Sequence, residues 1–234
     1  MPLTGHLGEL RKRVVRILCA VAAGFGVSFF FSERIVDLMT RPIRTSLIFT
    51  APTEPLWSNL KVALFSGLLL SLPVILHQVY QFIAPGLYPR ERKNVLPFIA
   101  VGTFFFLLGI SFCYFVVLPL ALKFLMHYKT GSLVPMISIG VYVDFILKFM
   151  LAFGLIFELP VVIIFLARLG LLTPDFLSRN RKYAVLINFI LAAVLTPTPD
   201  IFNQCLMAGP LILLYEVGII GARWFGKKRV AENF

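Results

Sequence analysis

Long apolar runs separated by short polar segments make up most of this chain. A helix needs about 20 residues, at about 1.5 Å per residue, to cross a hydrocarbon layer of about 30 Å. Six runs are therefore predicted to form membrane-spanning helices, and the chain is predicted to be a single all-α domain covering residues 1–234. The predicted spans cover about residues 14–31, 59–80, 94–118, 142–169, 183–195 and 201–222.

Prolines and one short run shape these predicted helices. Proline has no backbone N–H and its ring collides with the preceding helical turn, so we expect the second span to be broken at Pro73 and the third to stop at Pro119. The fifth span has only thirteen residues, or about 20 Å, which is short for an ordinary bilayer. The polar segment Ser32–Ser58 and the basic loop Gly170–Lys182 are expected to connect spans.

Composition and charge support a membrane protein and suggest its orientation. Apolar residues make up 59% of the 234 and charged residues 14%, against about 45–50% and about 25% in soluble domains. Of the 22 Lys and Arg, fifteen lie at the two termini and in the loops predicted on the same side, and five lie in the opposite loops. This bias predicts that both termini are cytoplasmic. Because topology accounts for the net charge of +11, we predict no nucleic-acid partner.

Residues for catalysis or metal binding are sparse. The sequence contains no phosphate-binding GxxxxGK[ST] loop and no HExxH. Its three histidines fall on different segments, and its three cysteines are scattered without CxxC spacing. We therefore predict that the protein is not an enzyme and that it holds neither a metal nor a cofactor.

One carboxylate falls near the middle of a predicted span. Glu158 lies ten residues from Lys148 and ten from Arg168, or about 15 Å along the axis from each. A carboxylate at that depth must be protonated or paired, so a functional role is one hypothesis; a structural hydrogen bond near Pro160 is the other. Asp144 and Lys148 share an arc of about 80° with Glu158, which predicts a polar stripe facing protein or trapped water.

Two further carboxylates lie at predicted cytoplasmic ends of spans. Glu9 and Glu91 suit the capture of cationic groups, particularly guanidinium, which a carboxylate binds through two parallel hydrogen bonds. Simpler interpretations exist for both. Glu9 could pair with Arg13 four residues later, and Glu91 could be a first-turn acid after Pro89.

Prolines within spans leave other functions open. Pro73, Pro160 and Pro210 would free backbone carbonyls, as the interrupted helices of transporters do. A proton-coupled small-solute transporter and a structural membrane scaffold therefore remain alternatives.

Six motifs follow one another in order over about residues 3–225. They are His6-Leu7-x-Glu9-Leu10-Arg11-x-Arg13, Pro73-Val74-Ile-Leu-x-Gln78, Phe82-Ile-x-Pro85-x-Leu87-Tyr88 with Glu91-Arg92, Tyr114-Phe115 with Leu118-Pro119, Phe157-Glu158-x-Pro160, and Pro199-Asp200-x-x-x-Gln204. With these motifs the chain resembles TatC, the multi-spanning receptor subunit of the twin-arginine protein translocase.

The resemblance implies a cup of six tilted helices in the prokaryotic cytoplasmic (inner) membrane. It implies a receptor for twin-arginine signal peptides of folded cargo proteins. This receptor would assemble with single-span partner subunits and with further copies of itself among membrane lipid, and the complex would move cargo using the protonmotive force. The residues implied to bind the signal peptide are Glu9, Arg11, Arg13, Phe82 and Glu91.

Two more positions take a role from the resemblance, and some depart from it. Glu158 matches the family's membrane-buried glutamate, and Gln204 matches a polar position where partner helices dock. His77 stands where a tyrosine is common, and Gly5 and Gly8 weaken the N-terminal helix, each by up to about 1 kcal/mol.

Overall fold

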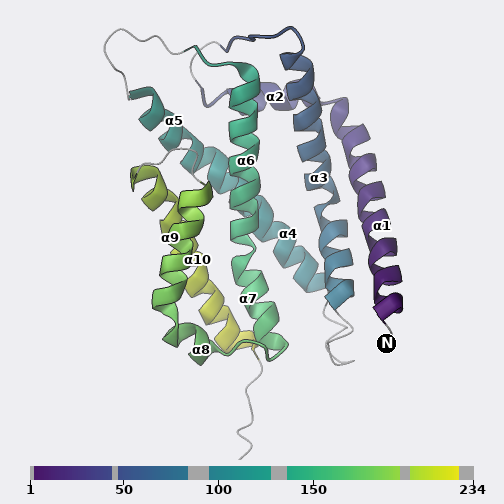
Figure 1. The fold of residues 1–234 in the computed structure, drawn as a ribbon, viewed down its shortest axis with the longest axis vertical. Coiled ribbons are helices and arrows are strands. Elements are labelled where there is room, and N and C mark those ends of the chain that lie inside the picture. The colour runs from purple at the N-terminus through teal and green to yellow at the C-terminus, as the bar shows by residue number, and fades with distance from the viewer. Residues whose placement is uncertain (1–2, 44–46, 84–94, 128–135, 196–200, 227–234) are drawn as a thin grey trace, which may run out of the picture. The chain divides into compact units, whose positions relative to one another are not determined.

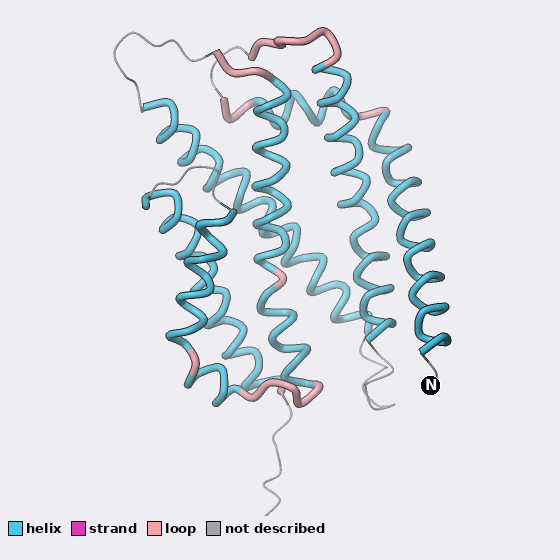
Figure 2. The backbone as a smooth tube through the Cα atoms, in the orientation of Figure 1, coloured by secondary structure: helices cyan, strands magenta, loops and turns pink. Residues whose placement is uncertain are grey.

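The computed structural model describes residues 3–43, 47–83, 95–127, 136–195 and 201–226, and these form helices joined by short connections (Figures 1 and 2). In these ranges the β-type pairing is one isolated bridge between Ile48 and Ser138. The helices are α1 Leu3–Phe29, α2 Ser32–Thr40, α3 Glu54–Ile83, α4 Val95–Phe112, α5 Leu118–His127, α6 Ile139–Phe157, α7 Leu159–Arg168, α8 Pro174–Arg179, α9 Arg181–Leu195 and α10 Ile201–Phe225, with a π-helical turn at Cys113–Val117.

Each predicted span coincides with helix, so the prediction of an all-α polytopic membrane protein is confirmed. Among the described residues, four helical stretches are long and apolar enough to cross a membrane, or five if α1 and α2, bent by 77°, form one span. The fourth predicted span is the pair α6 and α7, which together cover Ile139–Arg168. The fifth is α9, which has fifteen residues.

Two predicted proline breaks are wrong. Pro73 lies inside α3, which continues to Ile83. Two residues earlier, the Ser71 hydroxyl donates to the carbonyls of Gly67 (2.8 Å) and Leu68 (3.0 Å). These bonds lie in the same turn as the Leu69 carbonyl, which Pro73 leaves without its helical donor. Pro119 follows the π-helical turn and occupies the first turn of α5, where a helix needs no N–H from it.

Two short helices lie in segments predicted as connections. α2 is amphipathic and turns sharply away from α1. α8 begins in a pattern typical of helix starts, because the Thr173 hydroxyl accepts from the Phe176 N–H (3.2 Å), Pro174 is the first helical residue and Asp175 lies in the first turn. These signals were present in the sequence.

The contacts group the chain into two compact units, and the single domain predicted for residues 1–234 stays a prediction. Unit 1 contains residues 1–103 and 114–150, and unit 2 contains residues 104–113 and 151–234.

In unit 1, α1 packs along α3. The two helices touch backbone to backbone at a pair of glycines. A Cβ on Gly67 would lie 2.4 Å from the Phe25 nitrogen, and one on Gly24 would lie 2.5 Å from the Gly67 oxygen. Only glycine allows this approach, as at many close helix crossings in membranes.

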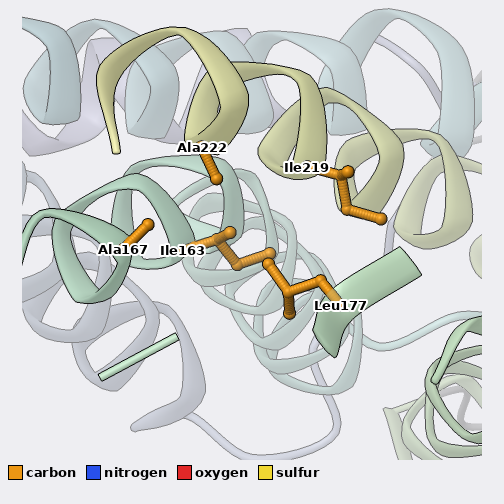
Figure 3. Packing of buried hydrophobic residues seen from close by; sticks show 5 residues of the cluster. All are labelled: Ile163, Ala167, Leu177, Ile219 and Ala222. Atoms are coloured by element: carbon orange, nitrogen blue, oxygen red, sulfur yellow. The ribbon is translucent and has the colours of Figure 1, made fainter. Parts of the chain in front are cut away.

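In unit 2, α10 packs against α7, α8 and α9. Figure 3 shows the buried cluster that joins three of these helices. Its side chains come from α7, α8 and α10, and the Tyr215 hydroxyl of α10 also donates to the Leu177 carbonyl of α8 (3.1 Å). The cluster consists of Ile163, Ala167, Leu177, Ile219 and Ala222.

Candidate functional site

A polar network joins the N-terminal part of α1 to the last turns of α3. Arg13 forms an ion pair with Glu9, one turn earlier on the same face of α1. Its other terminal nitrogen donates to Gln81 Oε1 (3.0 Å) and to the Gln78 carbonyl (3.4 Å), both on α3. The Arg13 side chain is 11% exposed and that of Glu9 is 37% exposed. Arg13 is thus the anchored partner, and Glu9 is the accessible one.

The network continues along α3 to a histidine. Gln81 Nε2 lies 2.9 Å from Nε2 of His77, one turn back. Phe82 follows directly and is half-buried. A carboxylate, a guanidinium, two amides, an imidazole and an aromatic ring are therefore gathered at this end of the helix pair.

Two atoms of this network are buried without a hydrogen-bond partner in the described part of the chain. They are Arg13 Nε, a donor, and Gln78 Oε1, an acceptor. Gln78 is only 7% exposed. Buried polar groups are nearly always paired in folded proteins, so these two atoms mark the cluster as incompletely satisfied. The accessible Glu9 carboxylate, held in place by Arg13, suits a ligand that carries several N–H donors, such as guanidinium.

The structure brings together some of the predicted signal-peptide residues. Glu9 and Arg13 are in contact, which also realises the simpler interpretation of Glu9 as an intrahelical ion-pair partner. Arg11 is exposed on α1. Glu91 lies outside the described residues, so its place in the site stays a prediction.

Three network residues were not predicted as site residues: His77, Gln78 and Gln81. The available signal was three polar side chains within five positions at the end of α3. That spacing shows that they lie near one another on α3, whereas their link to Arg13 depends on how α1 packs.

Glu158 lies in the break between α6 and α7. It is 9% exposed. Its backbone carbonyl accepts from the Val162 N–H (2.9 Å), and its side chain makes no capping bond to α7. Within the described residues, its Oε1 has no hydrogen-bond partner. The predicted burial of this carboxyl is confirmed.

The predicted polar stripe on the same span holds only in part. Asp144 is paired with Lys61 of α3 (2.6 Å), and both side chains are more than two-fifths exposed. Lys148 is exposed, so the structure shows only part of the stripe against protein, and its contact with trapped water stays a prediction. A long lysine side chain can lie along an apolar surface and carry its charge toward a polar region, which makes such a position tolerable.

Gln204 lies in the first turn of α10. Its Nε2 donates to the Phe189 carbonyl of α9 (3.1 Å). On α9, Asn188 is buried, and its Nδ2 has no partner among the described residues. The geometry shows a polar junction between these helices, whereas the docking role of Gln204 stays a prediction. No group of three metal-ligating side chains occurs in the described ranges.

Comparisons with known proteins agree with the sequence motifs. The family described as Sec-independent protein translocase protein (TatC) matches residues 5–210. The Sec-independent protein translocase protein TatC of Desulforapulum autotrophicum is 45% identical, over 99% of this chain and 88% of that protein. The protein of the same name from Carboxydothermus hydrogenoformans is 42% identical, over 97% of this chain and 95% of that protein.

Solved structures are similar along nearly the whole chain. The crystal structure of the twin-arginine translocase receptor TatC in DDM is 39% identical, with a TM-score of 0.82, over 95% of this chain and 100% of that one. A second crystal structure of that receptor is 38% identical, with a TM-score of 0.80, over 94% of this chain and 98% of that one. Sequence and fold therefore lead to one conclusion: this chain belongs to the TatC family of Sec-independent protein translocase proteins.

Proposed function

We propose that this chain is the signal-peptide receptor and core membrane component of a twin-arginine translocase, which exports folded proteins using the protonmotive force. The observation that carries the proposal is the network at the end of α3, where the accessible carboxylate of Glu9 is held by Arg13, and Arg13 is held by two acceptors on α3. Relatives named as translocase proteins and solved receptors of the same fold support it. They also favour it over a small-solute transporter or a scaffold.

The site is proposed to recognise paired arginines. A guanidinium is planar and offers five donors, so it can engage a carboxylate through two parallel bonds and still reach a further acceptor. Glu9 and Glu91 would each take one arginine of the peptide. Phe82 would pack beside them, and Arg11 and Arg13 would complete the site, with Arg13 holding Glu9 in place.

The basic residues of the sequence support an orientation. Fifteen of the 22 Lys and Arg belong to the termini and to the two loops proposed to be cytoplasmic. The network lies at the same end, because it joins the start of α1 to the end of α3. We therefore place both termini and the peptide site in the cytoplasm and the chain in a prokaryotic inner membrane.

Other components of the complex follow from the same proposal. Single-span partner subunits would dock near Gln204, at the junction of α9 and α10. Further copies of this chain and the surrounding lipid would complete the assembly. The receptor would perform no catalysis and need no cofactor, since it recognises and moves its cargo.

The test is a titration of the full chain in nanodiscs with two labelled peptides, one carrying Arg-Arg and one Lys-Lys. Ammonium groups cannot form the guanidinium fork, so the Arg-Arg peptide should bind more tightly. Hydrogen bonds to charged groups contribute about 1.5–3 kcal/mol each, so Glu9→Ala and Glu91→Ala should each weaken its binding about tenfold or more.

A matched control is Glu33→Ala, which removes an exposed carboxylate from α2 and should leave binding unchanged. The double variant, Glu9→Ala with Glu91→Ala, should no longer distinguish the two peptides. Should it keep the wild-type preference for Arg-Arg, these carboxylates are not the recognition site.

A further inference from the structure

The hydrogen bonds around Gln81 determine the protonation state of His77. A side-chain amide offers one oxygen that accepts and one NH2 group that only donates. The Gln81 oxygen accepts from Arg13 (3.0 Å), so its NH2 group is the one that faces His77 Nε2 (2.9 Å). That imidazole nitrogen must therefore be the acceptor. His77 is neutral in this arrangement, with its proton on Nδ1.

A proton added to His77 would reverse this chain of bonds. Protonated Nε2 becomes a donor and faces another donor, the NH2 group of Gln81. The amide group of Gln81 can rotate by half a turn, so that its oxygen faces His77 and its NH2 group faces Arg13. Arg13 then loses one of the two acceptors that hold it to α3 and faces a donor instead. One proton at His77 thus acts on Arg13 through Gln81.

Arg13 in turn positions Glu9. Arg13 is the more buried member of that ion pair and is held from α3 at two acceptors, the Gln81 side chain and the Gln78 carbonyl. A carboxylate has room for about four hydrogen bonds, so Glu9 can be fixed by Arg13 and still accept a ligand. If Arg13 loosens, the carboxylate loses its defined orientation.

Among the described residues, the charged groups near the network can be assigned by element. From α1 they are Glu9 and Arg13, which contact it, whereas the remaining basic side chains of this part of α1 are exposed. From α3, Gln78 and Gln81 are neutral. From α4, the ring of Phe98 packs on Tyr80 (6.0 Å between centroids) and carries no charge. The exposed basic residues of α1 are Arg11, Lys12 and Arg16.

We propose that His77 and Gln81 are positioning residues for guanidinium recognition, and that together they make signal-peptide binding sensitive to cytoplasmic pH. The proposal rests on the peptide site proposed above. Histidine is the side chain whose charge ordinarily changes between pH 5 and 8. Affinity should be high when His77 is neutral and should fall as pH decreases and His77 gains a proton.

The experiment measures the affinity of the Arg-Arg and Lys-Lys peptides for the full chain in nanodiscs between pH 8 and pH 6. For the wild type, the affinity for Arg-Arg should fall about threefold to tenfold across this range, the effect of about one hydrogen bond. The preference for Arg-Arg over Lys-Lys should shrink with it. A charge on His77 acting only at long range would weaken both peptides equally and leave that preference unchanged, which would contradict the positioning role.

Two variants separate His77 from other titrating groups. His77→Gln keeps a neutral acceptor for Gln81 at every pH, so its affinity for the Arg-Arg peptide should not fall between pH 8 and pH 6. Gln81→Leu should bind about threefold to tenfold more weakly at pH 8 and also lose the pH dependence. His6→Gln is the matched control, because His6 is close to Glu9 in sequence, and it should keep the wild-type dependence.

The outcomes distinguish this inference from the proposed function. A pH dependence that persists in His77→Gln, or that is absent from the wild type, overturns the positioning role and leaves the receptor proposal standing. No preference for Arg-Arg at pH 8 overturns the receptor proposal and, with it, this one. Nitrogen NMR of labelled histidine tests the geometry without any peptide: at pH 8 the His77 proton should be on Nδ1, and a proton on Nε2 would contradict the bonding described above.

Discussion

The two ends of α3 use a glutamate in opposite ways. At the N-terminal end, Glu54 accepts from the Gly140 N–H (3.1 Å) and the Ser138 hydroxyl through one oxygen, and from the Thr50 N–H (2.7 Å) and hydroxyl (3.2 Å) through the other. At the C-terminal end, the Glu9 carboxylate of α1 is anchored by Arg13 beside α3.

The donors explain the difference. Glu54 fills its lone pairs with groups from two connecting segments, and next to it the bridge Ile48–Ser138 joins the same segments. The Glu54 carboxylate therefore connects the segment before α3 to the start of α6. The network around Arg13 keeps two buried atoms unused, Arg13 Nε and Gln78 Oε1. A carboxylate whose hydrogen bonds are all made within the chain has a structural role, whereas an incompletely satisfied cluster can still bind a ligand.

The largest predicted effect comes from separating the two helices between these ends. In Gly67→Ala the new methyl group would lie 2.4 Å from the Phe25 nitrogen, a backbone atom that cannot move alone. Inserting a group into such a contact costs about 1–3 kcal/mol or more. We expect a lower unfolding temperature in detergent and a loss of Arg-Arg peptide binding, since Arg13 on α1 would move away from α3.

Gly26→Ala is the matched control for this change. It adds the same methyl group to α1, where nothing lies within 4 Å. Its peptide binding should equal that of the wild type, and its unfolding temperature should be equal or higher, because alanine favours a helix more than glycine does. If Gly67→Ala behaves in the same way, the α1–α3 contact does not align the site.

How much of this the sequence predicts depends on the range of each interaction. Apolar runs predict every long helix because burial in a bilayer needs only local composition. The Glu9–Arg13 pair follows from its spacing of four on one helix. The link from Arg13 to Gln81 connects positions 68 apart, and no local pattern gives it. It requires the glycine contact that sets α1 against α3.

The same reasoning accounts for what was missed elsewhere. Glu54 was not singled out because half of its donors lie near position 140, far from it in sequence. The nearby Thr50 alone gives no sign of this role. The predicted breaks at Pro73 and Pro119 are wrong because proline removes only one helical hydrogen bond. α3 continues through Pro73 despite that loss, and Pro119 lies in the first turn of α5, where a helix needs no N–H from it. Local rules estimate how much a residue destabilises a helix, and the surrounding structure determines whether the helix forms in spite of it.

The next predicted effect compares the removal of the glutamate at each end of α3. Glu54→Ala removes the acceptor of two backbone N–H groups, those of Thr50 and Gly140. Hydrogen exchange at these amides should become about tenfold faster, while the affinity for the Arg-Arg peptide stays within about twofold of wild type. Glu9→Ala should do the reverse, with weak peptide binding and unchanged exchange at Thr50 and Gly140. Equal effects of the two variants on peptide binding would contradict a structural role for Glu54 and a binding role for Glu9.

The smallest effect is expected at a third carboxylate, Glu158, which resembles neither end of α3. It is 9% exposed, and in the described residues its Oε1 finds no hydrogen-bond partner. Burial without a cation disfavours the charged form, so a neutral carboxyl is the expected ground state. Glutamine matches that state in size and polarity. Glu158→Gln should therefore leave the unfolding temperature, peptide affinity and transport into inverted vesicles close to wild type, whereas Glu158→Lys introduces an unpaired buried charge and should destabilise the protein. If Glu158→Gln binds peptide and assembles normally but fails to transport, a neutral structural carboxyl is ruled out, and the unpaired oxygen belongs to a group that must gain and lose a proton during transport.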